Sequence, residues 1–307
     1  MTNFSHFSDP LACSEDLKGG RYRQQDKNQS RFRYFGAVRI SDMHDTLSSL
    51  VERAIAGQNR PLEFYLLEHS RLPGPRANLE LANDVAYLLA SASEKYPERV
   101  LALVKNFSNG DRKSVVVNTP AEFVMLCGVV SAGACAAIRP EWRENIVEML
   151  NHYACNPSWR VREAVSSAFQ HLLIADPQAT LAYLSTLAMD GDFLQQRASV
   201  AAVAEPRLLY NAETAVAALQ LQRIVLEHVS HIPASERKSP DFLILRRALG
   251  YTLSVVVAAL PEEGFAFMRE YAALSDADVA WILRENLKKK RLAKFTQEIA
   301  RVVALLT

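Results

Sequence analysis

The chain has 307 residues, of which 49% are hydrophobic and 22% charged, and its formal net charge at pH 7 is +1. These values are near globular averages, so the chain can build a sizeable core, and they exclude a wholly basic or strongly acidic protein. Only 11 residues are glycine, and no Asn-Gly or Asp-Gly precedes an alternating apolar run, so tight β-hairpins are not expected.

Cysteine usage and the lack of targeting signals predict a cytoplasmic protein. The cysteines are Cys13, Cys127, Cys135 and Cys155. None belongs to a Cys-x-x-Cys motif, so we expect reduced thiols. The first residues show no charged segment followed by an apolar one, so no secretory signal is expected. The apolar runs at 123–138 and 251–260 are shorter than the roughly 18 residues of a membrane span, so we interpret them as buried helices and expect no membrane partner.

Residues 1–38 differ from the remainder in composition. They are polar and aperiodic, and between Asp16 and Arg39 seven Lys or Arg residues accompany two Asp. This composition predicts a flexible basic arm. We expect residues 39–307 to form one helical body, with a first helix from Ser41 to about Gly57 and a second at 61–70. The Leu-Pro-Gly-Pro run after Arg71 should then break the helical pattern.

Prolines recur where further helices should begin. They are Pro97, Pro120, Pro140, Pro157 and Pro177, at spacings of 23, 20, 17 and 20 residues. Good capping residues precede several prolines, including Thr119, Asn156, Asp176 and Ser239, and acidic residues follow many of them. Starts at about half of a 35 to 45 residue period indicate antiparallel helix pairs stacked into an α-solenoid.

The helical periodicity is almost unbroken from Leu79 onward. One apolar stripe follows Asn156. In the helix expected at 193–209, Pro206 should end or kink the helix because proline lacks a backbone donor. Later helices are expected at 177–189, 193–209, 212–229, 240–260, 261–274, 276–290 and 292–306.

Four helix starts share a sequence pattern. The segments that begin at residues 156, 190, 239 and 276 each contain a capping residue, then a large apolar residue, then an arginine. The arginines are Arg162, Arg197, Arg246 and Arg284. Here the chain resembles the HEAT-repeat family across residues 79–306. The resemblance implies an all-α, armadillo-type fold, in which each of these arginines pairs inside the stack and forms a ladder between repeats. These arginines are 35, 49 and 38 residues apart, so an inserted loop is expected around 231–239.

Other basic residues are candidates for binding. If some arginines point into a concave groove, Arg160 and Arg247, which flank the ladder positions, are the freer ones to bind phosphates or acidic side chains. A denser basic patch follows Arg284 on an expected helix, and it is either a solvated cap or a surface for a polyanion. Its residues are Lys288, Lys289, Lys290, Arg291 and Lys294.

Known nucleotide and metal motifs are absent. The sequence contains no GxxxxGK, GxGxxG or HExxH, so we expect no cofactor. His228 with His231, and His152 with Cys155, each provide two metal ligands at helical spacing, which is too few for a site. No metal is therefore expected.

A second resemblance is more distant. Residues 246–251 look like helices of the AlkD-like DNA glycosylases, HEAT-like enzymes that remove alkylated bases with aromatic residues and an aspartate in a basic groove. In this chain Trp159 with Glu163, and Trp281 with Glu285, combine a tryptophan with an acid four residues later. Neither pair supplies the aspartate. Because Trp159 also fits the large apolar position of the repeat, we favour packing over catalysis for it.

These patterns favour a non-catalytic helical-repeat scaffold. Stacked helix pairs bury their apolar faces together and leave an extended surface for a partner. We expect a macromolecular partner, a protein in the first place, on the concave face. The alternative is an AlkD-like DNA-binding protein or alkylpurine DNA glycosylase, in which Trp159 and Glu163 would be the catalytic candidates.

Overall fold

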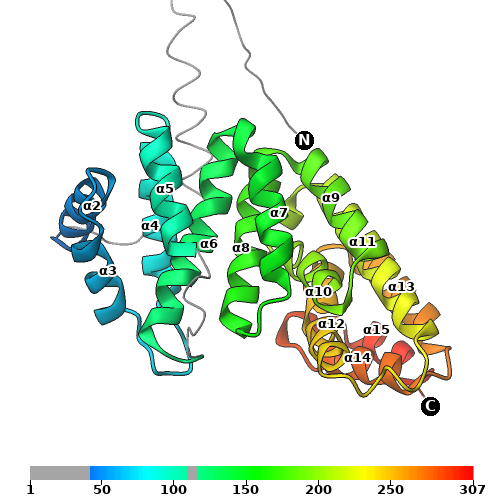
Figure 1. Ribbon diagram of the computed structural model, residues 1–307. Helices are drawn as coiled ribbons and strands as arrows, with labels where there is room; N and C mark the ends of the chain where they lie inside the picture. Colours follow the sequence, from blue (N-terminus) through cyan, green and yellow to red (C-terminus); the bar gives the residue numbers. More distant parts are fainter. Residues whose placement is uncertain (1–41, 109–116, 307) are drawn as a thin grey trace, which may run out of the picture. The chain divides into compact units, whose positions relative to one another are not determined.

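The computed structural model describes residues 42–108 and 117–306 (Figure 1). The chain divides into residues 1–39 and 40–307, and the predicted basic arm lies outside the described residues. The described part is all-α, with fourteen α-helices, three short 3-10 helices and no strand. The predicted fold class is therefore confirmed at the level of all-α.

The α-helices have the following bounds: α2 (Asp42–Ile55), α3 (Asn59–Glu68), α4 (Leu79–Ser93), α5 (Pro97–Ser108), α6 (Pro120–Ile138), α7 (Arg143–Ala154), α8 (Trp159–Ala175), α9 (Pro177–Asp190), α10 (Phe193–Ala202), α11 (Ala212–His231), α12 (Pro240–Ala259), α13 (Pro261–Ala272), α14 (Ala277–Leu287) and α15 (Thr296–Val303). The 3-10 helices are η1 (Pro140–Trp142), η2 (Leu208–Tyr210) and η3 (Lys290–Leu292).

Three of the expected ranges extend more than two residues past the observed helices. The helix expected at 193–209 ends at Ala202, before Pro206, because proline cannot continue it. The ranges 276–290 and 292–306 contain the shorter helices α14 and α15, separated by η3. Apolar periodicity alone did not reveal this break.

Proline and a capping side chain start several helices as predicted. Asp176 accepts a hydrogen bond from the Ala179 amide at 3.2 Å before Pro177, and Ser239 caps α12 in the same way. Two starts lie elsewhere than expected. Pro140 opens η1, and α8 is capped by Ser158 rather than by Asn156.

The end of α2 requires a glycine. Gly57 has φ +100°, a left-handed conformation that side chains disfavour. Its amide donates to the Ala54 carbonyl at 2.9 Å, and the Gln58 amide donates to the Arg53 carbonyl at 2.9 Å. This pair of bonds is a Schellman motif, which satisfies carbonyls at the helix end. The predicted end near Gly57 is confirmed.

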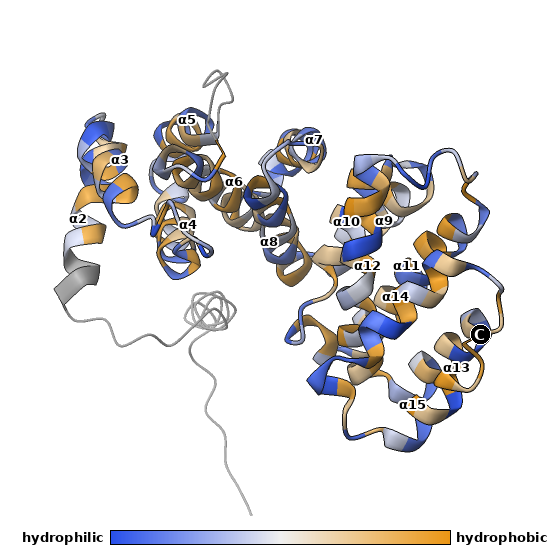
Figure 2. Ribbon diagram, turned by 90° about the horizontal axis from the view of Figure 1, so that it is seen from below, coloured by the Kyte–Doolittle hydropathy of each residue, from blue (hydrophilic) through white to orange (hydrophobic). Residues whose placement is uncertain are grey.

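The helices pack in a regular order. Each even-numbered helix from α2 to α12 contacts the helix that follows it and also the next even-numbered helix (Figure 1). Many helices carry both hydrophobic and hydrophilic residues (Figure 2). The buried apolar side chains join in one core. The even-numbered helices thus form a row, and α4, α6 and α8 are consecutive members of it.

Helix α6 has the largest number of buried residues in this row, fifteen of nineteen. A Cβ atom on Gly128 would lie 2.4 Å from the Ser108 amide, and one on Gly133 would lie 2.5 Å from Ala168. These glycines let α5 and α8 approach α6 closely. Two described helices, α6 and α12, are long and apolar enough for a membrane span, but 83% and 61% of their apolar windows are buried in the protein, as in core helices of soluble proteins.

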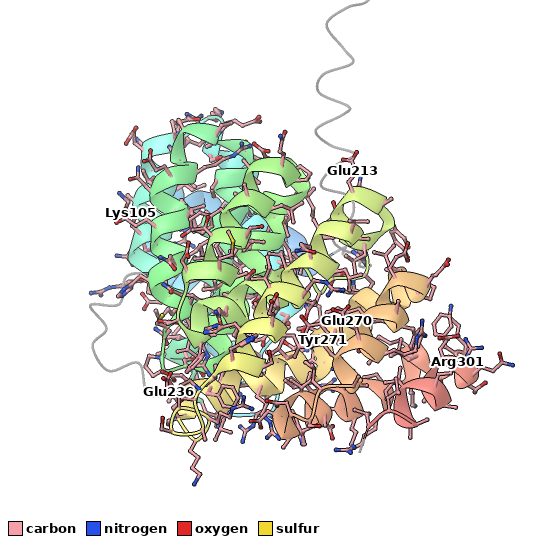
Figure 3. All side chains as sticks on the ribbon, turned by 90° about the vertical axis from the view of Figure 1, so that its right-hand side faces the viewer. Lys105, Glu213, Glu236, Glu270, Tyr271 and Arg301 are labelled. Atoms are coloured by element: carbon pink, nitrogen blue, oxygen red, sulfur yellow. The ribbon has the colours of Figure 1, made fainter. Side chains whose placement is uncertain are left out.

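The interruption expected around 231–239 is present. Residues 232–239 connect α11 to α12, and Glu236 marks this connection in Figure 3. Arg237 holds the connection in place, since its guanidinium lies 2.7 Å from Asp276 and 3.1 Å from Asp278 at the start of α14. The loop therefore joins the following helix pair instead of projecting freely.

Candidate functional site

A hollow of about 470 Å³ lies between α4, α6 and α8, within the size range of ligand pockets. Its floor is apolar, with Leu126 and Val130 from α6, and its rim carries charges of both signs. We call it the Trp159 pocket. It is lined by Arg71, Arg76, Ala77, Leu79, Glu80, Ala82, Asn83, Leu126, Val130, Trp159, Arg160, Glu163, Ala164 and Ser167.

Trp159 forms an aromatic wall of the pocket. It is the first residue of α8, and 46% of it is exposed. The Ser158 hydroxyl caps the helix by accepting from the Val161 amide at 3.2 Å, which fixes the position of this turn. The guanidinium of Arg160 lies 4.6 Å from the centre of the Trp159 ring. Trp159, for which packing in the repeat was favoured over catalysis, is only half-buried and stands at the surface beside a cavity.

Arg160 has a role different from the one expected. Only 4% of it is exposed, so it is not a free binding arginine. Its guanidinium lies 3.2 Å from Glu122 and donates to the Gly74 carbonyl at 2.6 Å and to Asn118 at 3.1 Å. Its Nε is buried and has no hydrogen-bond partner in the described part of the chain.

Glu122 completes this buried network. It is fully buried in the first turn of α6 and accepts hydrogen bonds from the Ser158 hydroxyl and, at 2.8 Å, from the Asn118 amide. The network therefore ties the loop after α3 to the starts of α6 and α8. The sequence marked Glu122 only as an acid in a first helical turn, and it gave no sign of the burial.

The charges around the pocket are nearly all paired. Arg71 lies 3.1 Å from Glu80 on the rim. Arg160 pairs with Glu122 below the rim. Arg76 is exposed and has no ion-pair partner among the described residues. Counting the described residues, Arg76 is therefore the one unbalanced positive charge at the rim of the pocket.

Glu163 lies one helical turn after Trp159 and also lines the pocket. It forms an ion pair with Arg197 of α10, whose guanidinium also donates to the Arg162 carbonyl at 2.8 Å. Tyr251 of α12 lies near this pair. Burial raises the pKa of the Tyr251 hydroxyl, and the Glu163 carboxylate raises it further. The structure thus brings Trp159 and Glu163 together at one site.

The second tryptophan–acid pair forms no such site. The Trp281 ring lies 4.0 Å from the guanidinium carbon of Arg246, and Glu285 pairs with Lys288 at 2.5 Å. Lys288 holds the pKa of Glu285 below its usual value. Neither residue lines the Trp159 pocket.

The four arginines of the repeated helix-start pattern have different surroundings. Arg162 is buried and donates to the carbonyls at 156 and 157, and burial lowers its pKa. Arg197 connects α10 to α8 as described above, and Arg246 lies 2.7 Å from Asp278 of α14. Arg284 is exposed on α14. Arg237, which the alignment missed because it lies in a loop, also connects neighbouring units.

The other basic candidates lie apart from the pocket. Arg247 is exposed on α12. The basic patch is not on a continuous helix, because α14 ends at Leu287 and the patch crosses a turn and η3. Its lysines and arginine are exposed except for Lys289, which is half-buried, and Lys288 is paired as described. Cations after a helix C-terminus are stabilised by the helix dipole.

The candidate metal ligands are engaged in other contacts. In the described residues no group of three or more His, Cys, Asp or Glu could hold a metal ion. His228 lies 2.6 Å from the side-chain amide of Gln196. Cys155 is exposed, and its thiol lies 3.2 Å from Asp192; partial desolvation together with this carboxylate raises the pKa of the thiol to about 12.

No family model, curated protein or solved structure matches the chain. The HEAT-like and AlkD-like resemblances therefore rest on the four helix-start segments and on residues 246–251 alone.

Proposed function

We propose that the described helices form a HEAT-like α-solenoid and that the protein is a non-catalytic cytoplasmic scaffold. The order of contacts supports this proposal, because each even-numbered helix from α2 to α12 packs on the next one and on its own successor. Such a stack buries each helix pair against its neighbours and leaves an extended surface. We take the exposed side of α4 and α8 as the inner, partner-binding side.

The exposure of Trp159 carries the functional proposal. A tryptophan that is 46% exposed beside a cavity of about 470 Å³ keeps apolar area in water that folding has not removed. Tryptophan is enriched among the residues that dominate protein interfaces. The arrangement supports binding of a protein partner, whose side chain would fill the pocket.

The mixed charges of the pocket favour a protein over a polyanion. Glu80 and Glu163 pair with Arg71 and Arg197, so among the described residues the wall lacks the cluster of unpaired cations that the phosphates of a nucleic acid would require. A protein surface can provide both signs of charge and an apolar anchor.

Cross-linking capture from extracts with and without nuclease treatment tests this proposal. We expect specific partners with the wild-type protein and their loss with Trp159→Ala. Tyr210→Ala is the matched control, since Tyr210 is 86% exposed on η2 and does not line the pocket. Equal capture by both variants would contradict a partner site at Trp159, and loss of capture after nuclease treatment would favour nucleic acid.

One observation favours the second candidate, an AlkD-like DNA glycosylase or DNA-binding protein. Trp159 and Glu163 share a pocket that also contains exposed arginines. A carboxylate beside an aromatic wall could stabilise a cationic sugar as an alkylated base leaves. The ion pair of Glu163 with Arg197 argues against catalysis, because the arginine already neutralises the Glu163 carboxylate.

Base release from methylated DNA tests the enzymatic candidate. It requires release of methylated purines by the wild-type protein and loss of release with Glu163→Gln. Absence of release at high enzyme concentration would exclude catalysis, and a binding titration across a salt series would test simple DNA binding, whose affinity should fall steeply with salt.

A further inference from the structure

We propose that the Trp159 pocket binds a segment of a partner protein in which a large apolar side chain stands next to an aspartate or glutamate. This inference rests on the proposed scaffold function and specifies the chemistry of the partner. The apolar side chain would contact Trp159, and the carboxylate would pair with Arg76.

The pocket has the shape and lining for an apolar anchor. Leu126 and Val130 form its floor, and the half-exposed Trp159 ring forms one wall. Leu79, which is 55% exposed, extends the apolar surface at the rim. An inserted aromatic or leucine side chain would remove these surfaces from water, and each square ångström of apolar area contributes about 25 cal/mol.

The balance of charge specifies the sign of the neighbouring group. The rim carboxylate Glu80 is matched by Arg71, and Glu163 is matched by Arg197. Arg76 is the cation at the rim without a partner in the described chain. A ligand with a carboxylate would neutralise it, whereas a lysine or arginine in the ligand would be repelled.

A buried polar group at the pocket also favours a ligand that supplies a hydrogen-bond acceptor. Arg160 lines the pocket and is 96% withdrawn from solvent, yet its Nε lacks a hydrogen-bond acceptor in the described residues. An unpartnered buried donor is costly. A bound segment that supplied an acceptor oxygen to this Nε would remove the cost, and both a carboxylate and a backbone carbonyl are such acceptors.

The test is a selection of random displayed peptides on the immobilised full-length protein, followed by calorimetric titration of the synthetic peptides. We expect selected sequences with Asp or Glu beside Phe, Trp or Leu. Arg76→Ala should weaken their binding about tenfold, the effect of losing one charge-assisted hydrogen bond. Trp159→Ala should weaken it at least as much.

Matched controls separate the pocket from general electrostatics. Arg99→Ala removes another exposed arginine, on α5 and outside the pocket, and it should leave affinity unchanged. Replacing the peptide carboxylate by its amide should cost the same factor with the wild-type protein and nothing further with Arg76→Ala. A phosphoserine version of each peptide distinguishes a carboxylate preference from a phosphate preference.

The outcomes distinguish this inference from the proposed function. Selected peptides that depend on Trp159 but are neutral, basic or bound better as phosphopeptides would overturn the acidic partner and leave the scaffold in place. Binding unchanged by Arg76→Ala would also overturn the acidic partner and leave the scaffold in place. Failure to select any peptide, while cross-linked partners still depend on Trp159, would have the same meaning. Partner capture independent of Trp159 would overturn both.

Discussion

Glu122 and Arg160 form an ion pair with side-chain exposures of 0% and 5%. Each charge has lost its water and is compensated by the other and by neighbouring polar groups. In an exposed pair such as Arg71 with Glu80, each charge keeps its water when the other is removed, so breaking the pair costs much less. The two pairs therefore provide an internal comparison at the scale of single residues.

Glu122→Gln should lower the free energy of unfolding by roughly 3–5 kcal/mol, because it leaves the Arg160 charge buried without its counterion. Urea denaturation measures this change. Glu80→Gln is the control and should change stability by less than about 1 kcal/mol. Equal effects of the two substitutions would show that the buried pair does not stabilise the fold as argued.

His171 predicts a dependence of stability on pH. Burial lowers its pKa to about 4, so the folded protein holds it neutral. In the unfolded chain the pKa of His171 is about 6.5. Between pH 6.5 and 4 the unfolded state therefore binds more protons than the folded state, so stability should fall as pH falls through this range.

The expected loss from His171 between pH 7 and pH 5 is about 2 kcal/mol. Denaturation at both pH values compares the wild-type protein with His171→Gln, which cannot titrate. The difference in stability between the two pH values should be smaller in the variant by about that amount. An identical pH dependence would contradict the lowered pKa.

At the scale of helices, glycines determine how closely two neighbouring helices can pack. Gly133 on α6 allows the α8 backbone at Ala168 to approach so closely that an added Cβ would lie 2.5 Å from it. Gly250 is also inside a helix, but an added Cβ there would meet side chains alone, the edge of the Trp281 ring at 3.1 Å and the Cβ of Glu285 at 3.4 Å. The same substitution should thus have different results at the two sites.

Gly133→Ala should destabilise the protein by roughly 1–3 kcal/mol, since the α6–α8 interface must open. Gly250→Ala should be close to neutral, because the gain in helix propensity offsets a small shift of the ring. Thermal unfolding followed by circular dichroism compares the two. Destabilisation by both alike would mean that helix packing at Gly133 is no closer than elsewhere.

Helix starts were predictable where the signal was local. Pro177 and Ser239 marked the starts of α9 and α12 correctly, because capping depends on residues within one turn. The burial of Arg160 was not predictable in this way. Its acceptor Gly74 lies 86 residues earlier in the chain, and periodicity carries no information about such distant loops.

The candidate site was predictable only in part. The four-residue spacing of Trp159 and Glu163 placed both on one face of a helix, as the pocket requires. The other wall comes from α4, and Arg76 lies in a loop without any motif. The position of these residues depends on how α4 packs beside α6, which the sequence alone did not specify.

The neighbour-to-neighbour packing has a consequence for the whole molecule. Interior helices such as α6 and α8 pack on both sides, whereas α2 and α15 stand at the ends of the described helical order. In a stack of this kind each unit is stabilised by its neighbours, so the end units have fewer stabilising interfaces.

Hydrogen exchange followed by mass spectrometry should reveal this gradient. Backbone amides of α6 and α8 should exchange most slowly, and those of α2 and α15 should exchange fastest. Interior peptides serve as the internal reference for terminal ones in the same sample. A uniform rate across all helices would indicate a single cooperative unit instead of a repeat stack.

The position of Trp159 gives the protein a natural optical reporter. Its indole is 46% exposed, whereas Trp142 and Trp281 are partly buried against the core. Emission from a hydrated indole lies at longer wavelength than emission from a dry one. Occupation of the pocket should therefore shift the intrinsic fluorescence to shorter wavelength, and ligands could be screened without any label.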